Sequence, residues 1–138
     1  MKTRFLSFLL AAIIVSASSC LTGSTDSNTG QIVSSGTWRV TLFTDSGNDE
    51  TSDFNGYSFT FSDGGTITAV KNGVTKTGTW SISNSSSKFN IDLGAKVDAN
   101  KPLGELTDDW KIISSSETVI RLTDDNSSSN EFLTFTKN

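Results

Sequence analysis

From residue 36 to the C-terminus, apolar and polar residues alternate one by one, and this period of two restricts the fold more than any other feature. Successive side chains of a β-strand point to opposite faces, so the pattern predicts strands with one apolar and one polar face. Turn sequences separate the segments, and Asn72-Gly73 is a strong hairpin signal. The alternating segments are 37–42, 57–62, 66–69, 74–82, 89–93, 110–113, 119–122 and 132–135.

These segments predict an all-β domain over 36–138, folded as an antiparallel up-and-down barrel of about eight strands. Closure into a barrel removes unpaired sheet edges. A β-sandwich is the alternative, although the chain lacks the paired cysteines that immunoglobulin-type sandwiches often have. The connection 94–109 breaks the alternation, and Leu103-Gly104-Glu105-Leu106 spaces two leucines for one helical turn. We expect this connection to form a lid over one barrel end.

The apolar face of the predicted strands carries most of the large aromatic residues. They are Trp38, Tyr57, Phe59, Phe61, Trp80, Phe89 and Trp110. Burying one large apolar side chain stabilises a fold by about 1.5–3 kcal/mol, so a filled core is the simplest interpretation. The alternative is a hydrophobic pocket near one mouth of the barrel. Its candidate ligand-binding residues are Trp38, Tyr57, Trp80 and Trp110, with the Tyr57 hydroxyl as a polar group.

The N-terminus has the organisation of a signal peptide over residues 1–19. A basic start is followed by the apolar run Phe5 to Ala17, which is shorter than the ~20 residues that span a bilayer. Cys20, the only cysteine, then stands where bacterial lipoproteins are cut and acylated, although Ala17 replaces the usual leucine. We expect lipidation of Cys20 with palmitate-type chains, because stable anchoring needs about two of them. Plain secretion with a free thiol is the alternative.

Residues 20–35 are rich in Ser, Thr and Gly, and this composition predicts a flexible, lipidated tether. Asp26 is the only acidic residue in the segment, so it lacks an acidic surface-export signal. We therefore expect an outer-membrane lipoprotein of the cell envelope, with the side of the membrane left open.

Histidine is absent from the 138 residues, and this absence limits the chemistry that the chain can perform. With Cys20 used as an anchor, Ser-His-Asp and Cys-His catalysis are excluded, and zinc, copper and haem sites lose their usual ligands. We expect no enzyme activity, no cofactor and no metal. Of 11 Lys and Arg residues, Lys2 and Arg4 leave with the signal, so 9 remain against 15 Asp and Glu. This net charge of −6 argues against a nucleic-acid partner.

The acidic residues form three clusters that require an explanation. The cluster from Asp45 to Asp53 fails the Ca²⁺-binding EF-hand pattern, because position twelve is Gly56 rather than glutamate. The pairs Asp108-Asp109 and Asp124-Asp125 contain neighbours in sequence, which point to opposite faces of a strand. They are poor candidates for a glycosidase pair, and a carboxylate-based hydrolase is the least favoured alternative.

Several motifs carry a resemblance to a known family. Gly36-Thr37-Trp38 resembles the Gly-x-Trp that opens lipocalin barrels, and Arg121 is a candidate for the basic residue that packs on that tryptophan. The other motifs are Asp49-Glu50-Thr51, Phe54-Asn55-Gly56-Tyr57-Ser58-Phe59-Thr60-Phe61, Gly78-Thr79-Trp80, Leu106-Thr107-Asp108-Asp109-Trp110 and Phe132-Leu133-Thr134-Phe135. Over 35–138 the chain resembles small lipocalin-like lipoproteins of the Bacteroidetes type. The resemblance implies a secreted or membrane-anchored calycin barrel and maps no functional residue except Cys20.

Two functions follow from these observations. The first is a lipid-anchored, non-enzymatic envelope protein whose barrel binds a small hydrophobic molecule. The alternative is a structural or inhibitory envelope protein with a solid barrel that binds a protein partner through its loops.

Overall fold

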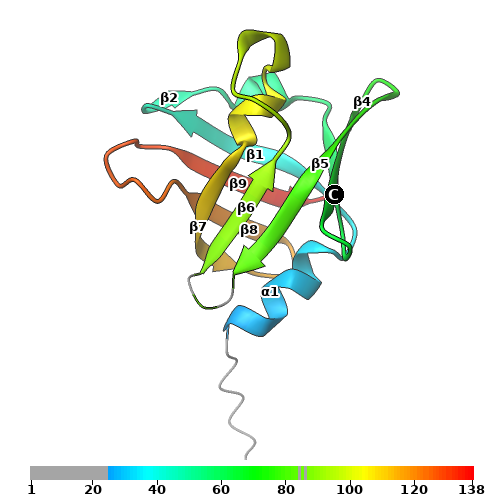
Figure 1. Cartoon of the computed structure of the whole chain (residues 1–138), viewed down its shortest axis with the longest axis vertical. Helices are drawn as coiled ribbons and strands as arrows, with labels where there is room; N and C mark the ends of the chain where they lie inside the picture. The colour runs from blue at the N-terminus through cyan, green and yellow to red at the C-terminus, as the bar shows by residue number, and fades with distance from the viewer. Residues whose placement is uncertain (1–24, 84, 86) are drawn as a thin grey trace, which may run out of the picture.

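The computed structural model describes residues 25–83, 85 and 87–138, and their strands form one closed antiparallel barrel (Figure 1). The strands are β1 (Thr37–Asp45), β2 (Asn48–Asp49), β3 (Ser58–Ser62), β4 (Thr66–Lys71), β5 (Val74–Ser83), β6 (Lys88–Asp92), β7 (Asp108–Ser115), β8 (Val119–Thr123) and β9 (Phe132–Lys137). Each pairs with the next in space, and β1 closes the barrel by pairing with both β3 and β9. The short β2 pairs antiparallel with the end of β1. The predicted eight-stranded barrel is confirmed, with one extra strand.

Within residues 25–83, 85 and 87–138, four helical segments connect or cover the strands. They are α1 (Thr25–Val33) and the 3₁₀ turns η1 (Thr51–Phe54), η2 (Asp98–Asn100) and η3 (Leu103–Leu106). No helix in the described part of the chain is long and apolar enough to cross a membrane.

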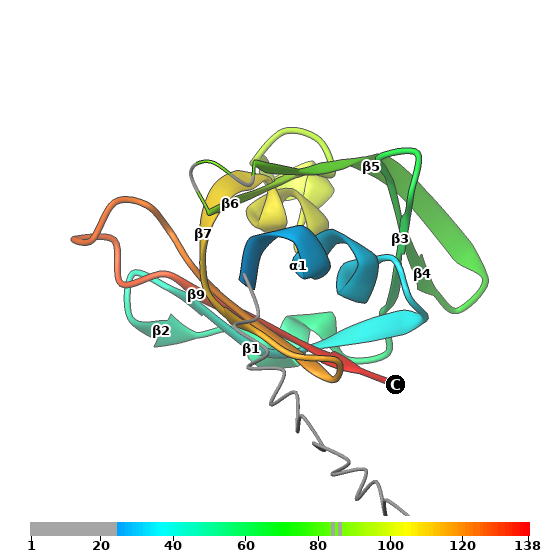
Figure 2. The ribbon, with the colours of Figure 1, turned by 90° about the horizontal axis from the view of Figure 1, so that it is seen from below.

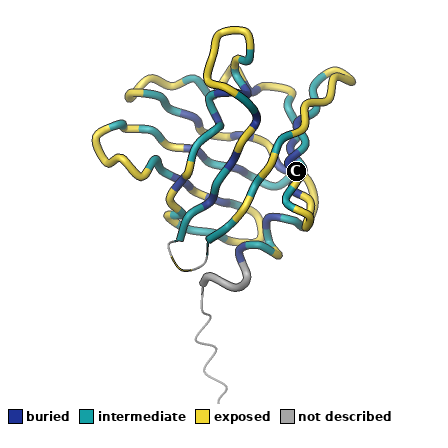
Figure 3. The backbone as a smooth tube through the Cα atoms, viewed as in Figure 1, coloured by how far each residue is buried: buried dark blue, intermediate teal, exposed yellow. Residues whose placement is uncertain are grey.

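Aromatic side chains fill the centre of the barrel, as the alternation predicts. Buried and exposed positions succeed one another along most strands (Figure 3). The rings of Phe61 and Trp80 meet edge to face with centroids 5.6 Å apart, and Phe61 meets Phe135 at 5.4 Å. Such ring pairs add about 0.5–1.5 kcal/mol beyond the burial of their area. The largest fully buried side chains are Trp38, Trp110, Phe43, Phe54, Phe59, Phe61, Phe89, Phe135, Ile67, Leu93, Leu106 and Ile120.

Helix α1 crosses one end of the barrel (Figure 2), which corrects the flexible tether expected over 20–35 for the stretch Thr25–Val33. The Trp38 indole N–H donates a 2.8 Å hydrogen bond to the Val33 carbonyl, and the Val33 side chain is fully buried. The hydroxyls of Thr29 and Ser115 lie 2.9 Å apart. These contacts with the barrel, rather than helix propensity, order a polar segment that is too short to be stable alone. Residues 20–24 of the expected tether lie outside the described residues.

The connection between β6 and β7 covers the opposite end of the barrel (Figure 1). The expected helical turn is confirmed as η3, whose Leu103 and Leu106 are buried. The Trp110 indole N–H donates to the Leu106 carbonyl at 3.0 Å. A tryptophan in a barrel strand thus holds the segment that covers each end: Trp38 of β1 bonds to the end of α1, and Trp110 of β7 bonds to η3.

Gly78 allows β5 to leave the barrel wall. A Cβ atom at this position would lie 2.0 Å from the Asp92 carbonyl oxygen, a distance that real contacts do not reach. The pairing of β5 with β6 ends one residue later, at Thr79 and Asp92. Residues 74–77 pair only with β4, so the β4–β5 hairpin projects beyond the rim of the barrel (Figure 1).

Candidate functional site

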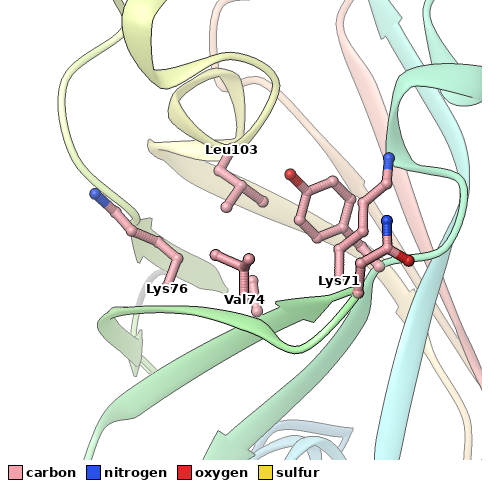
Figure 4. A pocket seen from close by; sticks show the side chains of 7 residues that line it. Lys71, Val74, Lys76 and Leu103 are labelled. Atoms are coloured by element: carbon pink, nitrogen blue, oxygen red, sulfur yellow. The ribbon is translucent and has the colours of Figure 1, made fainter.

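A pocket of about 300 Å³ lies between the projecting hairpin and η3, at the end of the barrel opposite α1 (Figures 1 and 4). This volume is at the lower limit of the ~300–1,000 Å³ typical of small-molecule sites. Its lining residues are Tyr57, Ala69, Lys71, Asn72, Val74, Lys76 and Leu103. We call it the mouth pocket.

The hairpin register determines which side chains face the mouth pocket. Lys71 pairs with Val74, and Ala69 pairs with Lys76. Residues directly opposite in an antiparallel pair lie on the same face, so these four side chains share the face that points into the barrel lower down. Beyond the rim no strand of the described residues covers this face, and Val74 is 73% exposed. The side of the hairpin that faces the core lower down is therefore exposed at the mouth of the barrel.

The mouth pocket combines an apolar floor with a cationic rim. Ala69 and Leu103 belong to the hydrophobic core and form the floor. The Lys71 ammonium lies 4.7 Å from the centroid of the Tyr57 ring, a cation–π contact. Figure 4 shows Lys71 and Lys76 on either side of Val74, with Leu103 facing them. The arrangement suits a ligand with an apolar body.

Of the four aromatic residues that the sequence singles out, only Tyr57 lines the mouth pocket. Trp38 and Trp110 are fully buried, and their indole N–H groups bond to backbone carbonyls. Trp80 is half-buried, donates to the Ser62 carbonyl at 2.9 Å and borders a separate hollow of about 190 Å³. A ligand role for these four residues stays a prediction. Cys20 lies outside the described residues.

Sequence reasoning missed Lys71, Val74, Lys76 and Leu103 as site residues. The two-residue turn at Asn72-Gly73 allows the hairpin register to be predicted, including the pairing of residue 71 with residue 74. The alternation does not show that the hairpin extends beyond the barrel rim. That depends on the close approach of the β5 backbone at Gly78 to the carbonyl oxygen of Asp92.

The basic residue over Trp38 is Lys137 rather than Arg121. The Lys137 ammonium lies 5.2 Å from the Trp38 ring centroid. Arg121 is exposed on β8 between the buried residues Ile120 and Leu122, so it faces outward. This is the solvated position that strict alternation gives it.

The acidic pairs of the sequence form surface ion pairs. Asp108 binds Lys96 at 2.6 Å, whereas Asp109 and Asp125 both bind the ammonium of Lys88. In the cluster from Asp45 to Asp53, an Asp49 carboxylate oxygen accepts the Thr51 N–H at 3.0 Å. Hydrogen bonding to Thr51 lowers the pKa of Asp49. Among residues 25–83, 85 and 87–138, no three Cys, Asp or Glu side chains are arranged to hold a metal ion.

Glu131 should make the stability of the barrel depend on pH. Burial raises its pKa from 4.5 to about 7, Lys96 opposes this shift, and Asp45, Asp124 and Asp108 add to it. A raised carboxyl pKa means that the folded state holds the proton more tightly, so the free energy of unfolding falls as pH rises from about 4.5 to 7. Glu131→Gln should remove this fall. After allowance for solvent screening, we expect the variant to be about 1 kcal/mol more stable at pH 8.

Urea unfolding at pH 5 and pH 8 measures this effect, and Glu117→Gln, at an exposed position, is the matched control. Equal pH dependence in the wild type and in Glu131→Gln would contradict the assignment.

No known family model matches the chain, and none of the curated proteins compared with it matches. Among solved structures, the chain is similar to a DUF4847 family protein from Bacteroides vulgatus ATCC 8482. The TM-score is 0.58 at 20% sequence identity, over 78% of this chain and 96% of that protein. At this identity the likeness establishes a shared fold: this chain is an antiparallel barrel of the kind found in that Bacteroides protein.

Proposed function

We propose that this protein is a non-enzymatic barrel of the cell envelope, held at the membrane by lipid on Cys20, and that it binds a small hydrophobic molecule in the mouth pocket. The observation that carries the proposal is the exposed Val74 side chain, 73% accessible above a floor of core residues. Covering apolar surface is favourable by about 25 cal/mol per Å². A ligand seated between Val74 and Leu103 would recover that free energy.

The filled barrel centre is the reason for proposing a site at the rim. Trp38, Phe59, Phe61 and Phe135 are fully buried, and their rings occupy the interior. A deep calyx of the kind that large lipocalins have would need that space. The mouth pocket instead lies above the aromatic core, at the barrel end where η3 lies, between η3 and the β4–β5 hairpin.

The described part of the chain begins with α1, at the end of the barrel opposite the mouth pocket. Cys20 precedes the first described residue of α1, Thr25, by five positions, which is at most ~18 Å of extended chain. Acylation of Cys20 would therefore hold the α1 end near the bilayer and turn the mouth pocket away from it (Figures 1 and 2). A ligand would enter from the aqueous side, which suits a carrier or receptor of the envelope.

Native mass spectrometry of the purified full chain with a lipid extract tests this function. We expect retained mass on the wild type and about tenfold weaker retention by Val74→Asn, because the loss of one apolar contact of ~1.4 kcal/mol is a factor of ten. Val97→Asn is the matched control, since Val97 is 51% exposed in the connection from β6 to β7 and does not line the mouth pocket. No retained mass on the wild type, or equal losses in the two variants, would contradict the proposal.

Native mass spectrometry with an extract of envelope proteins in place of the lipid extract tests the alternative function, a solid structural or inhibitory barrel that binds a protein through its loops. The aromatic filling of the centre favours that alternative. It predicts that added mass corresponds to an envelope protein and that both Val74→Asn and Val97→Asn weaken its retention, since both valines are exposed.

A further inference from the structure

We infer that the mouth pocket selects an anionic amphiphile, with the charged group held at the rim by Lys71 and Lys76 and the apolar chain against Val74 and Leu103. This inference rests on the proposed function of the pocket and names the class of molecule that it binds. The evidence comes from the charges at the rim, from the partners of the lysines and from the size of the pocket.

The charge at the mouth pocket is opposite to that of the whole chain. The protein has 15 acidic and 11 basic residues, a net charge of −4. The seven lining residues of the mouth pocket nevertheless include two lysines and no carboxylate. A cationic mouth on an acidic protein concentrates anions locally and repels cations. A neutral ligand would gain nothing from this distribution.

Neither rim lysine has the acidic partner that three of the other five described lysines have. Lys88, Lys96 and Lys101 each bind one or two carboxylates. For Lys71 and Lys76, no carboxylate of the described residues lies within ion-pair distance. The two rim ammonium groups are therefore available to an anionic group from outside the chain.

Lys71 is also held in position for this role. Its ammonium lies 4.7 Å from the centre of the Tyr57 ring, and its side chain is half-buried. A lysine can lay its methylene stem on apolar surface while its charge stays at the water boundary. The pocket thus has an apolar wall at Val74 and Leu103 and lysines at its edge (Figure 4). An amphiphile fits this arrangement with its chain beside Val74 and its anionic group at the rim.

The volume limits the ligand to a short chain. About 300 Å³ corresponds to ~10 non-hydrogen groups at ~30 Å³ each, the share of one molecule in liquid water. Decanoate, with a ten-carbon chain that ends in a carboxylate, is therefore a suitable probe. Decanol tests the chain without the charge, and acetate tests the charge without the chain.

Titration calorimetry of the full chain carrying Cys20→Ala, which cannot be acylated at that thiol, compares the three probes. We expect decanoate to bind five- to tenfold more tightly than decanol, as expected for about two partly exposed ion pairs, and acetate to bind too weakly to measure. The double variant Lys71→Gln with Lys76→Gln should lose the preference for decanoate and keep its affinity for decanol. Lys111→Gln, on an exposed position of β7, is the matched control and should behave as the parent protein.

The outcomes distinguish the proposed hydrophobic pocket from its proposed preference for an anionic ligand. If decanol and decanoate bind equally and the double lysine variant changes neither affinity, the inference about charge is wrong while the hydrophobic pocket stands. If neither chain-bearing probe binds, the proposed function itself is wrong for molecules of this size. Val74→Asn should weaken both decanoate and decanol by the same factor, and an effect on decanoate alone would also overturn the assignment. Near-ultraviolet circular dichroism of each variant confirms that it remains folded.

Discussion

Replacing Trp38 with alanine is expected to lower the free energy of unfolding by about 3–5 kcal/mol, the range for deletion of a buried aromatic side chain. Trp38 is fully buried on β1 and donates its indole N–H to the Val33 carbonyl at 2.8 Å. The variant would leave a cavity in the core and remove the bond that holds the end of α1. Urea unfolding followed by circular dichroism measures the loss.

Two further variants separate packing from hydrogen bonding at this position. Trp38→Phe keeps most of the ring but no donor, so we expect a smaller loss of about 1–2 kcal/mol. Trp80→Ala is the control for tryptophan removal in general, because Trp80 is half-buried and bonds to Ser62 at the surface. A loss below about 1 kcal/mol for Trp38→Ala, or an equal loss for Trp80→Ala, would contradict the role of Trp38.

The barrel itself was predictable because its strands keep a strict alternation that local sequence reveals. The pattern places Phe59 and Phe61 inside, as the structure has them. The spacing of Leu103 and Leu106 likewise predicts the helical turn η3. Each of these features depends on residues within a few positions of one another, which is the range that periodicity reports.

Helix α1 was not predictable in the same way, because its contacts are made with the barrel, in part with residues distant in sequence. Thr25–Val33 is polar, and composition alone assigns it to a flexible tether. The contacts that hold it are the bond from Trp38 to the Val33 carbonyl and the approach of Thr29 to Ser115. A local pattern cannot contain a contact across 86 positions.

The candidate site could be predicted only in part, since an inward aromatic residue serves a core and a ligand equally well. Trp38 and Trp110 are deep in the core, while Tyr57 reaches the mouth pocket. The difference is set by depth along the barrel, since Trp38 and Trp110 lie within β1 and β7, whereas Tyr57 precedes the first residue of β3. Lysines in a strand normally indicate solvent exposure, so no local pattern selects Lys71 as a site residue.

Replacing Cys20 with alanine is expected to move the protein completely from the membrane fraction to the soluble fraction while the barrel stays folded. The physical reason is that each buried methylene of an acyl chain contributes about 0.8 kcal/mol to membrane binding, and the variant has no thiol to acylate. Cell fractionation with intact-mass measurement of the mature protein checks both the location and the acylation. Ser19→Ala is the matched control, because it keeps a small residue before the cysteine and should remain in the membrane.

A Cys20→Ala variant that stays in the membrane fraction would show that another part of the chain anchors the protein. The mouth pocket makes the experiment more specific. It lies at the end of the barrel opposite α1, and Cys20 joins the barrel through the α1 end. Loss of the lipid should therefore leave the affinity for decanoate unchanged in the released protein. A change in that affinity would mean that the acyl chains themselves reach the mouth pocket, and anchoring and ligand binding would then be one function rather than two.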